Sequence, residues 1–174
     1  MKNHKEKNLR DIREVAARKL ARSSKTAYEL TVQLKKLGYE EEDVKSTIDS
    51  FLEIGYLDDY KYSLSFFRLG ANKGWGEGRI KRELGKKGVS QDIIMKALQN
   101  IYNDRDDIKR EDLRALEVAR KMVSLEDLNS KGFFEDKIKS RIARRLYSYG
   151  YSSDLIFKTI RTLERELMDN GEDN

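Results

Sequence analysis

The stretch Ile80-Lys-Arg-Glu-Leu84-Gly-Lys-Lys-Gly88-Val89 has two apolar residues four positions apart and a glycine four positions further on. Apolar residues at this spacing lie on one face of a helix, and a glycine just past a helix is typical of the left-handed C′ position. The same arrangement occurs before Gly38 and before Gly150. The sequence therefore predicts a helix that ends in a tight glycine turn, and predicts it at three places.

An internal repeat becomes visible when positions are counted from these three glycines. Apolar residues stand eight and four positions before each glycine, and six, ten and thirteen positions after it. The fifteen residues are Leu30, Ile80, Ile142, Leu34, Leu84, Leu146, Val44, Ile94, Ile156, Ile48, Leu98, Ile160, Phe51, Ile101 and Leu163. Because only 38% of the chain is hydrophobic, this agreement indicates a true repeat, each copy being an αα-hairpin. Ser90 and Ser152 stand where the second helix of a hairpin needs an N-cap.

A further apolar helical pattern precedes each hairpin. It is formed by Val15, Ala16 and Leu20, by Leu64, Phe67 and Ala71, and by Leu113, Leu116 and Ala119. We therefore predict an all-α fold of three tandem three-helix bundles in an elongated array that can curve. The expected domains are residues 1–57 with a basic N-terminal tail, 58–104, and 105–174 with an insertion near 125–134 and an acidic tail. Neighbouring bundles are expected to meet through the aromatic residues Tyr56, Tyr60, Phe66, Phe67 and Tyr102.

The composition argues against several classes of protein. The chain has 39% charged residues, with 36 Lys and Arg against 31 Asp and Glu, and it contains no cysteine. A disulfide framework, a thiolate zinc site and a cysteine nucleophile are thereby excluded. The segment Met1–Lys7 lacks the apolar stretch of a signal peptide, and no run reaches the roughly 18 apolar residues of a membrane span. We expect a cytoplasmic protein without a membrane segment.

Catalytic motifs are not evident either. The sole histidine, His4, lies in the basic tail. The segment Gly74-Trp-Gly-Glu-Gly78 is not followed by the Gly-Lys-Ser/Thr of a phosphate-binding loop, and is better explained as a flexible turn in which Trp75 packs. We expect no enzyme, no metal and no cofactor.

Basic residues gather in two helical segments at matching repeat positions. The candidate binding residues are Arg79, Arg82, Lys86 and Lys87 in the first segment, and Lys137, Arg141, Arg144 and Arg145 in the second. Arg79 and Arg141 lie nine positions before their glycines, and Arg82 and Arg144 lie six before. The pattern is compatible with an ordinary solvated surface, but its recurrence favours a surface for a polyanion or an acidic protein groove.

Three phrases carry a resemblance to a known family. They are Ser24-Lys-Thr-Ala-Tyr-Glu-Leu30 leading to Leu34-Lys-Lys-Leu-Gly-Tyr39, Gly55-Tyr-Leu-Asp-Asp59 followed by Tyr62, and the distinctive Gly74–Val89. Together with the third hairpin they resemble the RecX family, bacterial regulators of the recombinase RecA. The likeness extends over about residues 10–165. The lengthened region at 125–134 and the acidic tail at 164–173 have no counterpart that we can match in the family.

The resemblance implies a non-catalytic regulator, chiefly an inhibitor, of RecA. Family members suppress ATP hydrolysis, strand exchange and coprotease activity of RecA in DNA repair, recombination and the SOS response, and some bind DNA directly. The family fold is also an array of nine helices in three units. The implied partners are the RecA filament and single-stranded DNA, with double-stranded DNA as a further ligand, and the chain is expected to act as a monomer.

The resemblance also marks a set of family-motif residues. These are Gly55, Tyr56, Leu57, Asp58, Asp59, Ile80, Leu84 and Gly88. They can serve structure as much as binding, and we expect Tyr56 and Leu57 in the core or between repeats.

Two alternatives stay open at this point. One is a helical array that binds nucleic acid without RecA specificity, with an affinity that depends steeply on salt. The other is a structural adaptor with no link to nucleic acid.

Overall fold

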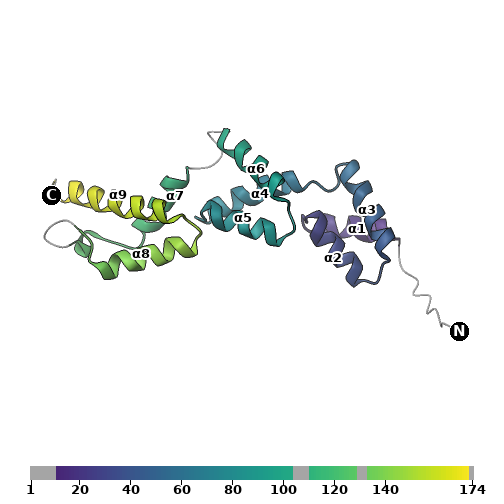
Figure 1. Cartoon of the computed structure of the whole chain (residues 1–174), viewed down its shortest axis with the longest axis horizontal. Helices are drawn as coiled ribbons and strands as arrows, with labels where there is room; N and C mark the ends of the chain where they lie inside the picture. The colour runs from purple at the N-terminus through teal and green to yellow at the C-terminus, as the bar shows by residue number, and fades with distance from the viewer. Residues whose placement is uncertain (1–10, 104–109, 129–132, 173–174) are drawn as a thin grey trace. The chain divides into compact units, whose positions relative to one another are not determined.

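The computed structural model describes residues 11–103, 110–128 and 133–172. Within these ranges the chain forms nine α-helices and one short 3-10 helix at Leu125–Asp127 (Figure 1). The helices are α1 (Ile12–Arg22), α2 (Ala27–Lys36), α3 (Glu41–Glu53), α4 (Asp59–Asn72), α5 (Glu77–Lys86), α6 (Gln91–Asn103), α7 (Glu111–Arg120), α8 (Asp136–Ser148) and α9 (Ser153–Glu172). The only β-type pairing in the described residues is an isolated bridge between Leu128 and Phe134. The all-α prediction is confirmed.

The repeat register derived from the three glycines is confirmed side chain by side chain. All fifteen apolar repeat positions, Ile80 and Leu84 among them, are buried, and none is more than 8% exposed. Gly38, Gly88 and Gly150 have φ angles of +90°, +78° and +88°, which L-residues rarely adopt. The residue after each glycine donates its backbone N–H to the carbonyl of the leucine four positions before the glycine, at 3.5, 3.2 and 3.2 Å. Each hairpin therefore has the same C-terminal cap on its first helix.

The second helix of each hairpin begins as its sequence predicts. Ser90 Oγ accepts from the N–H of Ile93 at 3.4 Å, and Ser152 Oγ accepts from the N–H of Leu155 at 3.3 Å. Glu40, which stands at the same position in the first hairpin, makes no side-chain cap. The first turn of α3 instead carries several carboxylates, which interact favourably with the positive end of the helix dipole.

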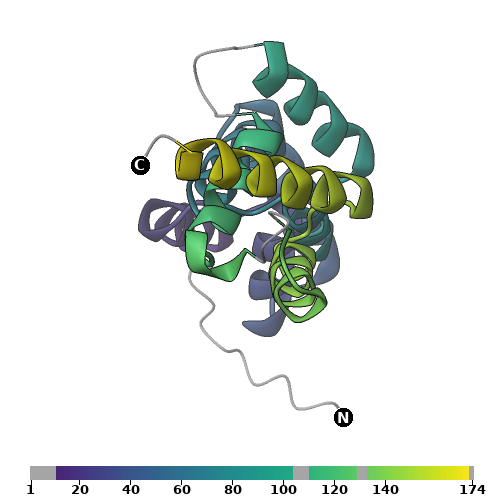
Figure 2. The same cartoon turned by 90° about the vertical axis from the view of Figure 1, so that its left-hand side faces the viewer.

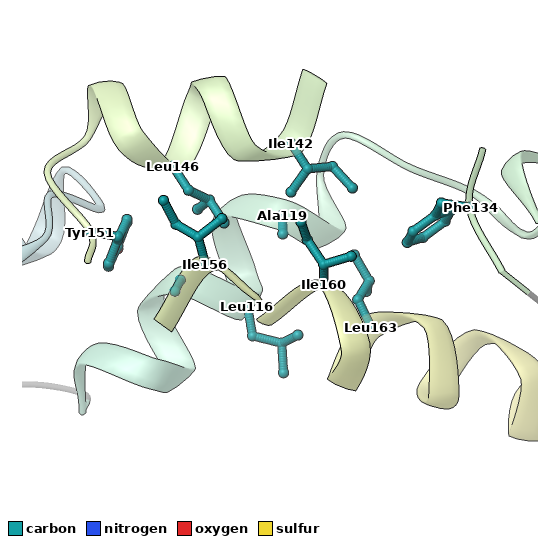
Figure 3. Close-up of a cluster of buried hydrophobic side chains, with 10 residues drawn as sticks. Leu116, Ala119, Phe134, Ile142, Leu146, Tyr151, Ile156, Ile160 and Leu163 are labelled. Carbon is teal, nitrogen blue, oxygen red and sulfur yellow. The ribbon is translucent and has the colours of Figure 1, made fainter. Parts of the chain in front are cut away.

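The described helices fall into two compact units that cut across the expected domains. One contains residues 1–65 and 84–97, and the other contains 66–83 and 98–174. The core of the first unit is formed by Ala16, Leu30, Leu34, Val44, Ile48, Phe51 and Leu57. In the second unit α7, α8 and α9 pack on one another (Figure 2), and their core includes Leu116, Ala119, Phe134, Ile142, Leu146, Tyr151, Ile156, Ile160 and Leu163 (Figure 3).

A hydrogen bond and close packing at Gly88 hold residues 84–97 against α2 in the first unit. Thr26, the N-cap of α2, donates its hydroxyl to the carbonyl of Lys87 at 2.6 Å. A Cβ added to Gly88 would lie 2.3 Å from the Cβ of Tyr28. At the same place the backbone N–H of Ala27 donates to Oδ1 of Asp59 at 2.9 Å. The glycine turn of the second hairpin thus rests on the beginning of α2.

The second unit contains the same contact at equivalent repeat positions. The N–H of Gly76 donates to the carbonyl of Tyr149 at 2.8 Å, and a Cβ added to Gly150 would lie 2.3 Å from the backbone nitrogen of Arg79. The N–H of Glu77 donates to Oε1 of Glu111 at 2.7 Å, as Ala27 does to Asp59. We call each of these arrangements, at the beginning of α2 and at the beginning of α5, a turn-docking contact.

The aromatic residues that were expected between neighbouring repeats differ in burial. Phe67 is buried and Phe66 packs near Trp75, with 6.3 Å between ring centroids. Tyr56 and Tyr102, however, are 63% and 47% exposed. Close docking needs small residues and unpaired N–H groups at a helix start, so the contact depends on glycine and caps more than on large rings.

The turn-docking contact at α5 predicts a dependence of stability on pH. Burial and the neighbouring carboxylate of Glu111 raise the pKa of Glu77 from 4.5 to about 7. Because the folded state holds this proton more tightly than the unfolded state, the contribution of Glu77 to stability is greatest below pH 4.5 and is lost as pH rises through about 7. We expect the free energy of unfolding to fall by ~1–2 kcal/mol across this window, less than the full shift implies because solvent screens the pair.

Chemical denaturation at pH 5.0 and 7.5 measures this effect. In Glu77→Gln the fall should nearly vanish, whereas Glu42→Gln, at an exposed position of α3, should retain it. A fall of equal size in both variants would mean that another group is responsible.

Candidate binding surface

The basic residues of α5 differ in how strongly the fold holds them. Arg79 is half-buried, with its guanidinium 4.2 Å from the ring centre of Trp75, and it donates to the carbonyl of Ser148 at 3.5 Å. Lys87, just after α5, forms a 2.6 Å ion pair with Glu29. Arg82 and Lys86 are exposed. Arg79 and Lys87 thus support the turn-docking contacts, while Arg82 and Lys86 present charge to the solvent.

The environment of Lys87 also affects its protonation. Burial lowers the pKa of Lys87, but hydrogen bonds to Glu29 and Tyr62 outweigh burial, so that the pKa is raised overall. Lys87 therefore remains charged at neutral pH.

The basic residues of α8 divide in the same way. Arg141 donates to the carbonyl of Met122 at 2.9 Å and lies 3.6 Å from Asp127, which ties α8 to the 3-10 helix. Lys137 and Arg144 are exposed. The Nε of Arg144 donates to the carbonyl of Ser140 one turn earlier, at 3.2 Å.

An aromatic and cationic cluster in the second unit was not predicted from the sequence. The guanidinium of Arg145 lies 4.3 Å from the ring centre of Tyr149 and donates to its hydroxyl at 2.5 Å. The guanidinium of Arg79 lies 5.9 Å from the same ring and also covers Trp75. Arginine on an aromatic face is a favourable contact. The one sequence feature that could have indicated this cluster is Tyr149, which directly precedes Gly150 in the turn of the third hairpin.

A polar cavity of about 310 Å³ lies beside this cluster, and the sequence did not reveal it either. Its lining includes four cationic side chains and one acidic one, namely Lys73, Arg114, Lys121, Arg145 and Glu117. They come from the residue after α4, from α7 and the residue after it, and from α8. This excess of positive charge suits a carboxylate or a phosphate group.

The family-motif residues around Gly55 have structural roles. Gly55, with φ +74°, ends α3, and Leu57 is buried in the first core. Asp58 Oδ1 accepts the N–H of Lys61 at the start of α4, and Asp59 contributes to the turn-docking contact. The expectation for Leu57 is confirmed. The expectation for Tyr56 is wrong, because its ring touches Phe51 at 5.4 Å between centroids but is otherwise exposed.

Among the described residues, no group of three or more His, Cys, Asp or Glu side chains could hold a metal ion. In the same part of the chain, no helix has the length and apolar character needed to span a bilayer.

Comparison with known proteins identifies relatives of the chain. Residues 58–98 match a family model described as RecX, second three-helix domain. The regulatory protein RecX of Vibrio vulnificus (strain CMCP6) is 31% identical over 144 residues, covering 83% of this chain and 87% of that protein. That of Clostridium botulinum (strain Alaska E43 / Type E3) is 33% identical over 149 residues, covering 86% of this chain. The chain spans 56% to 66% of the length of this protein and of two other curated relatives.

Solved structures agree in fold. The crystal structure of RecX from Lactobacillus salivarius has a TM-score of 0.73 and 23% identity, covering 88% of this chain and 94% of that one. A second crystal structure, of a regulatory protein RecX, has a TM-score of 0.66 and 21% identity over 87% of this chain and 72% of that one. The fold therefore defines an all-α helical-repeat protein. With the sequence relatives added, the chain belongs to the RecX family of regulatory proteins.

Proposed function

We propose that this chain binds the RecA–DNA filament and acts chiefly as its inhibitor, modulating ATP hydrolysis, strand exchange and coprotease activity in DNA repair and recombination. The observation that carries the proposal is the match to regulatory proteins of the RecX family over most of the chain. The chain acts in the cytoplasm, as a monomer and without a cofactor or a catalytic step of its own.

The proposed mechanism is mechanical. One turn-docking contact lies within each unit: the hydroxyl of Thr26 donates to the carbonyl of Lys87 in the first, and the N–H of Gly76 donates to the carbonyl of Tyr149 in the second. A chain held in this way and bound to neighbouring RecA protomers resists the subunit rearrangement that hydrolysis and strand exchange require. It can also block growth of the filament.

The exposed cations supply the attraction in this proposal. Arg82 and Lys86 on α5, and Lys137 and Arg144 on α8, carry charge that the fold leaves exposed. The polar cavity lined by Lys73 and Lys121 can receive a carboxylate of the partner or a phosphate of its DNA. Complementary charge favours rapid and specific encounter with an acidic filament.

The rival function is binding to nucleic acid without RecA specificity, and direct binding measurements separate the two. We expect fluorescently labelled chain to bind RecA filaments on single-stranded DNA at least tenfold more tightly than it binds the same DNA alone. Fluorescence anisotropy at several salt concentrations tests this expectation. Equal affinities with the same steep salt dependence would favour the rival, because phosphate contacts alone would then account for binding.

A further inference from the structure

The function proposed above assigns no occupant to a large groove on the second unit. It has a volume of about 740 Å³ and lies between α8 and α9. Its apolar lining includes Ala143 on α8 and Ile156 and Ile160 on α9. A concave, mostly apolar surface of this kind is typical of a binding site.

Exposed aromatic rings line this α8–α9 groove. Tyr147 is 72% exposed and Phe157 is 65% exposed, and both line the groove. Aromatic residues are enriched in the central contacts of protein interfaces. The ring of Phe133, 50% exposed, lies at the same groove.

The charge around the groove is predominantly positive. Lys139, Arg144 and Arg161 line it, and Glu164 is its single acidic residue. Glu164 is already engaged, because it accepts the N–H of Phe134 at 2.8 Å and pairs with Lys139 at 3.3 Å. The guanidinium of Arg161 stays beside the groove over the ring of Phe157, at 5.3 Å. A ligand for this groove should therefore combine apolar anchors with negative charge.

The repeat register argues against another hairpin as the occupant. Ser140, in the groove lining, occupies the position of Tyr28 and Gly78, which receive the glycine turns in the two turn-docking contacts. One position before it, Ala27 and Glu77 donate their backbone N–H groups across the two turn-docking contacts. Their counterpart Lys139 instead donates to the carbonyl of Glu135 within its own helix, because α8 begins three residues earlier. In the third hairpin, the N–H that would form the docking hydrogen bond is therefore already used within α8.

We propose that the α8–α9 groove receives an acidic amphipathic helix of the partner protein. Its apolar side would lie on Ile156 and Ile160 between the rings of Tyr147 and Phe157, and its carboxylates would face Arg144 and Arg161. Helix-in-groove recognition uses apolar anchors at the i, i+3, i+4 and i+7 positions, which suits a groove between two helices. This inference rests on the proposed function in one respect, since RecA is the partner in which the helix is sought.

Photocrosslinking identifies the occupant directly. A photoreactive benzoylphenylalanine replaces Tyr147 or, separately, Phe157, and the chain is irradiated with RecA filaments on single-stranded DNA. We expect a crosslink to an acidic amphipathic helix of RecA, mapped by mass spectrometry, and none when the same residue replaces the exposed Tyr102. A crosslink to DNA bases, to a basic or extended segment of RecA, or to nothing would overturn the proposal.

Truncated rings test the energetic role of the groove. In the double variant Tyr147→Ala with Phe157→Ala, the affinity for filaments should fall at least tenfold while circular dichroism stays unchanged, because both rings are exposed. Tyr56→Ala with Tyr102→Ala removes two exposed rings elsewhere and should leave the affinity within twofold of the wild type. Unchanged binding in the groove variant would refute the groove and leave the proposed function intact. Failure of the wild-type chain to bind filaments would refute the proposed function itself.

Discussion

Replacing Gly88 with alanine should destabilise the first unit by about 3 kcal/mol, whereas the same change at Gly38 should cost only about 1 kcal/mol. Both glycines end a helix in this unit with positive φ, so they share the conformational penalty of a Cβ. They differ in their surroundings. A Cβ at Gly38 meets no atom within 4 Å, but one at Gly88 would lie 2.3 Å from the Cβ of Tyr28.

The difference between the two variants isolates the turn-docking contact. The Cβ of Tyr28 moves only with its backbone, so Gly88→Ala must separate the glycine turn from the start of α2 and strain the hydrogen bond from Thr26. Urea denaturation followed by circular dichroism gives both free energies of unfolding. Equal losses at the two positions would show that the turn does not dock on α2 in solution.

Reversing Lys137 and Arg144 to glutamate should raise the concentration of chain needed for half-inhibition of RecA about a hundredfold. We expect each charge reversal to weaken binding by ~1.4 kcal/mol, which is a factor of ten in affinity. Both side chains are exposed on α8, so the fold should tolerate the change. Arg141 is left unchanged because it pairs with Asp127 of the 3-10 helix and donates to the carbonyl of Met122, so its reversal would confuse binding with folding.

The matched control for this experiment is the double reversal Arg13→Glu with Lys45→Glu. These two residues are exposed on α1 and α3 and supply the same change of charge on the same residue types. We expect the concentration needed for half-inhibition to stay within about threefold of the wild-type value, because only the change in net charge then weakens binding. Equal losses in the two double variants would rule out α8 as a specific contact.

The fold could be predicted from the sequence because its determinants are local. A glycine that needs positive φ, with apolar residues at fixed distances on either side, reveals each hairpin through periodicity alone. The turn-docking contact could not be predicted, because Thr26 and Lys87 are 61 residues apart and neither lies in an apolar pattern. Its hydrogen bonds depend on which helix start and which turn meet in three dimensions.

The positive charge of the candidate site could be predicted from the sequence, but which of its basic side chains are accessible to a partner could not. The basic character of α5 and α8 is visible in the sequence, but whether an arginine is accessible depends on its neighbours. Arg79 is half-buried beside Trp75, whereas Arg144 and Arg145 are exposed, although the guanidinium of Arg145 lies 4.3 Å from the ring centre of Tyr149. The α8–α9 groove escaped prediction because the periodicity places Tyr147 and Phe157 outside the core but does not show that α8 and α9 leave a groove between them.

The most direct test of RecA regulation is the rate of ATP hydrolysis by RecA on single-stranded DNA, measured as this chain is added. We expect the rate to fall at chain concentrations at least tenfold below the Kd of the chain for the same DNA without RecA. A rate that stays unchanged up to concentrations at which the chain saturates the bare DNA would contradict regulation of RecA and leave a nucleic-acid-binding repeat protein.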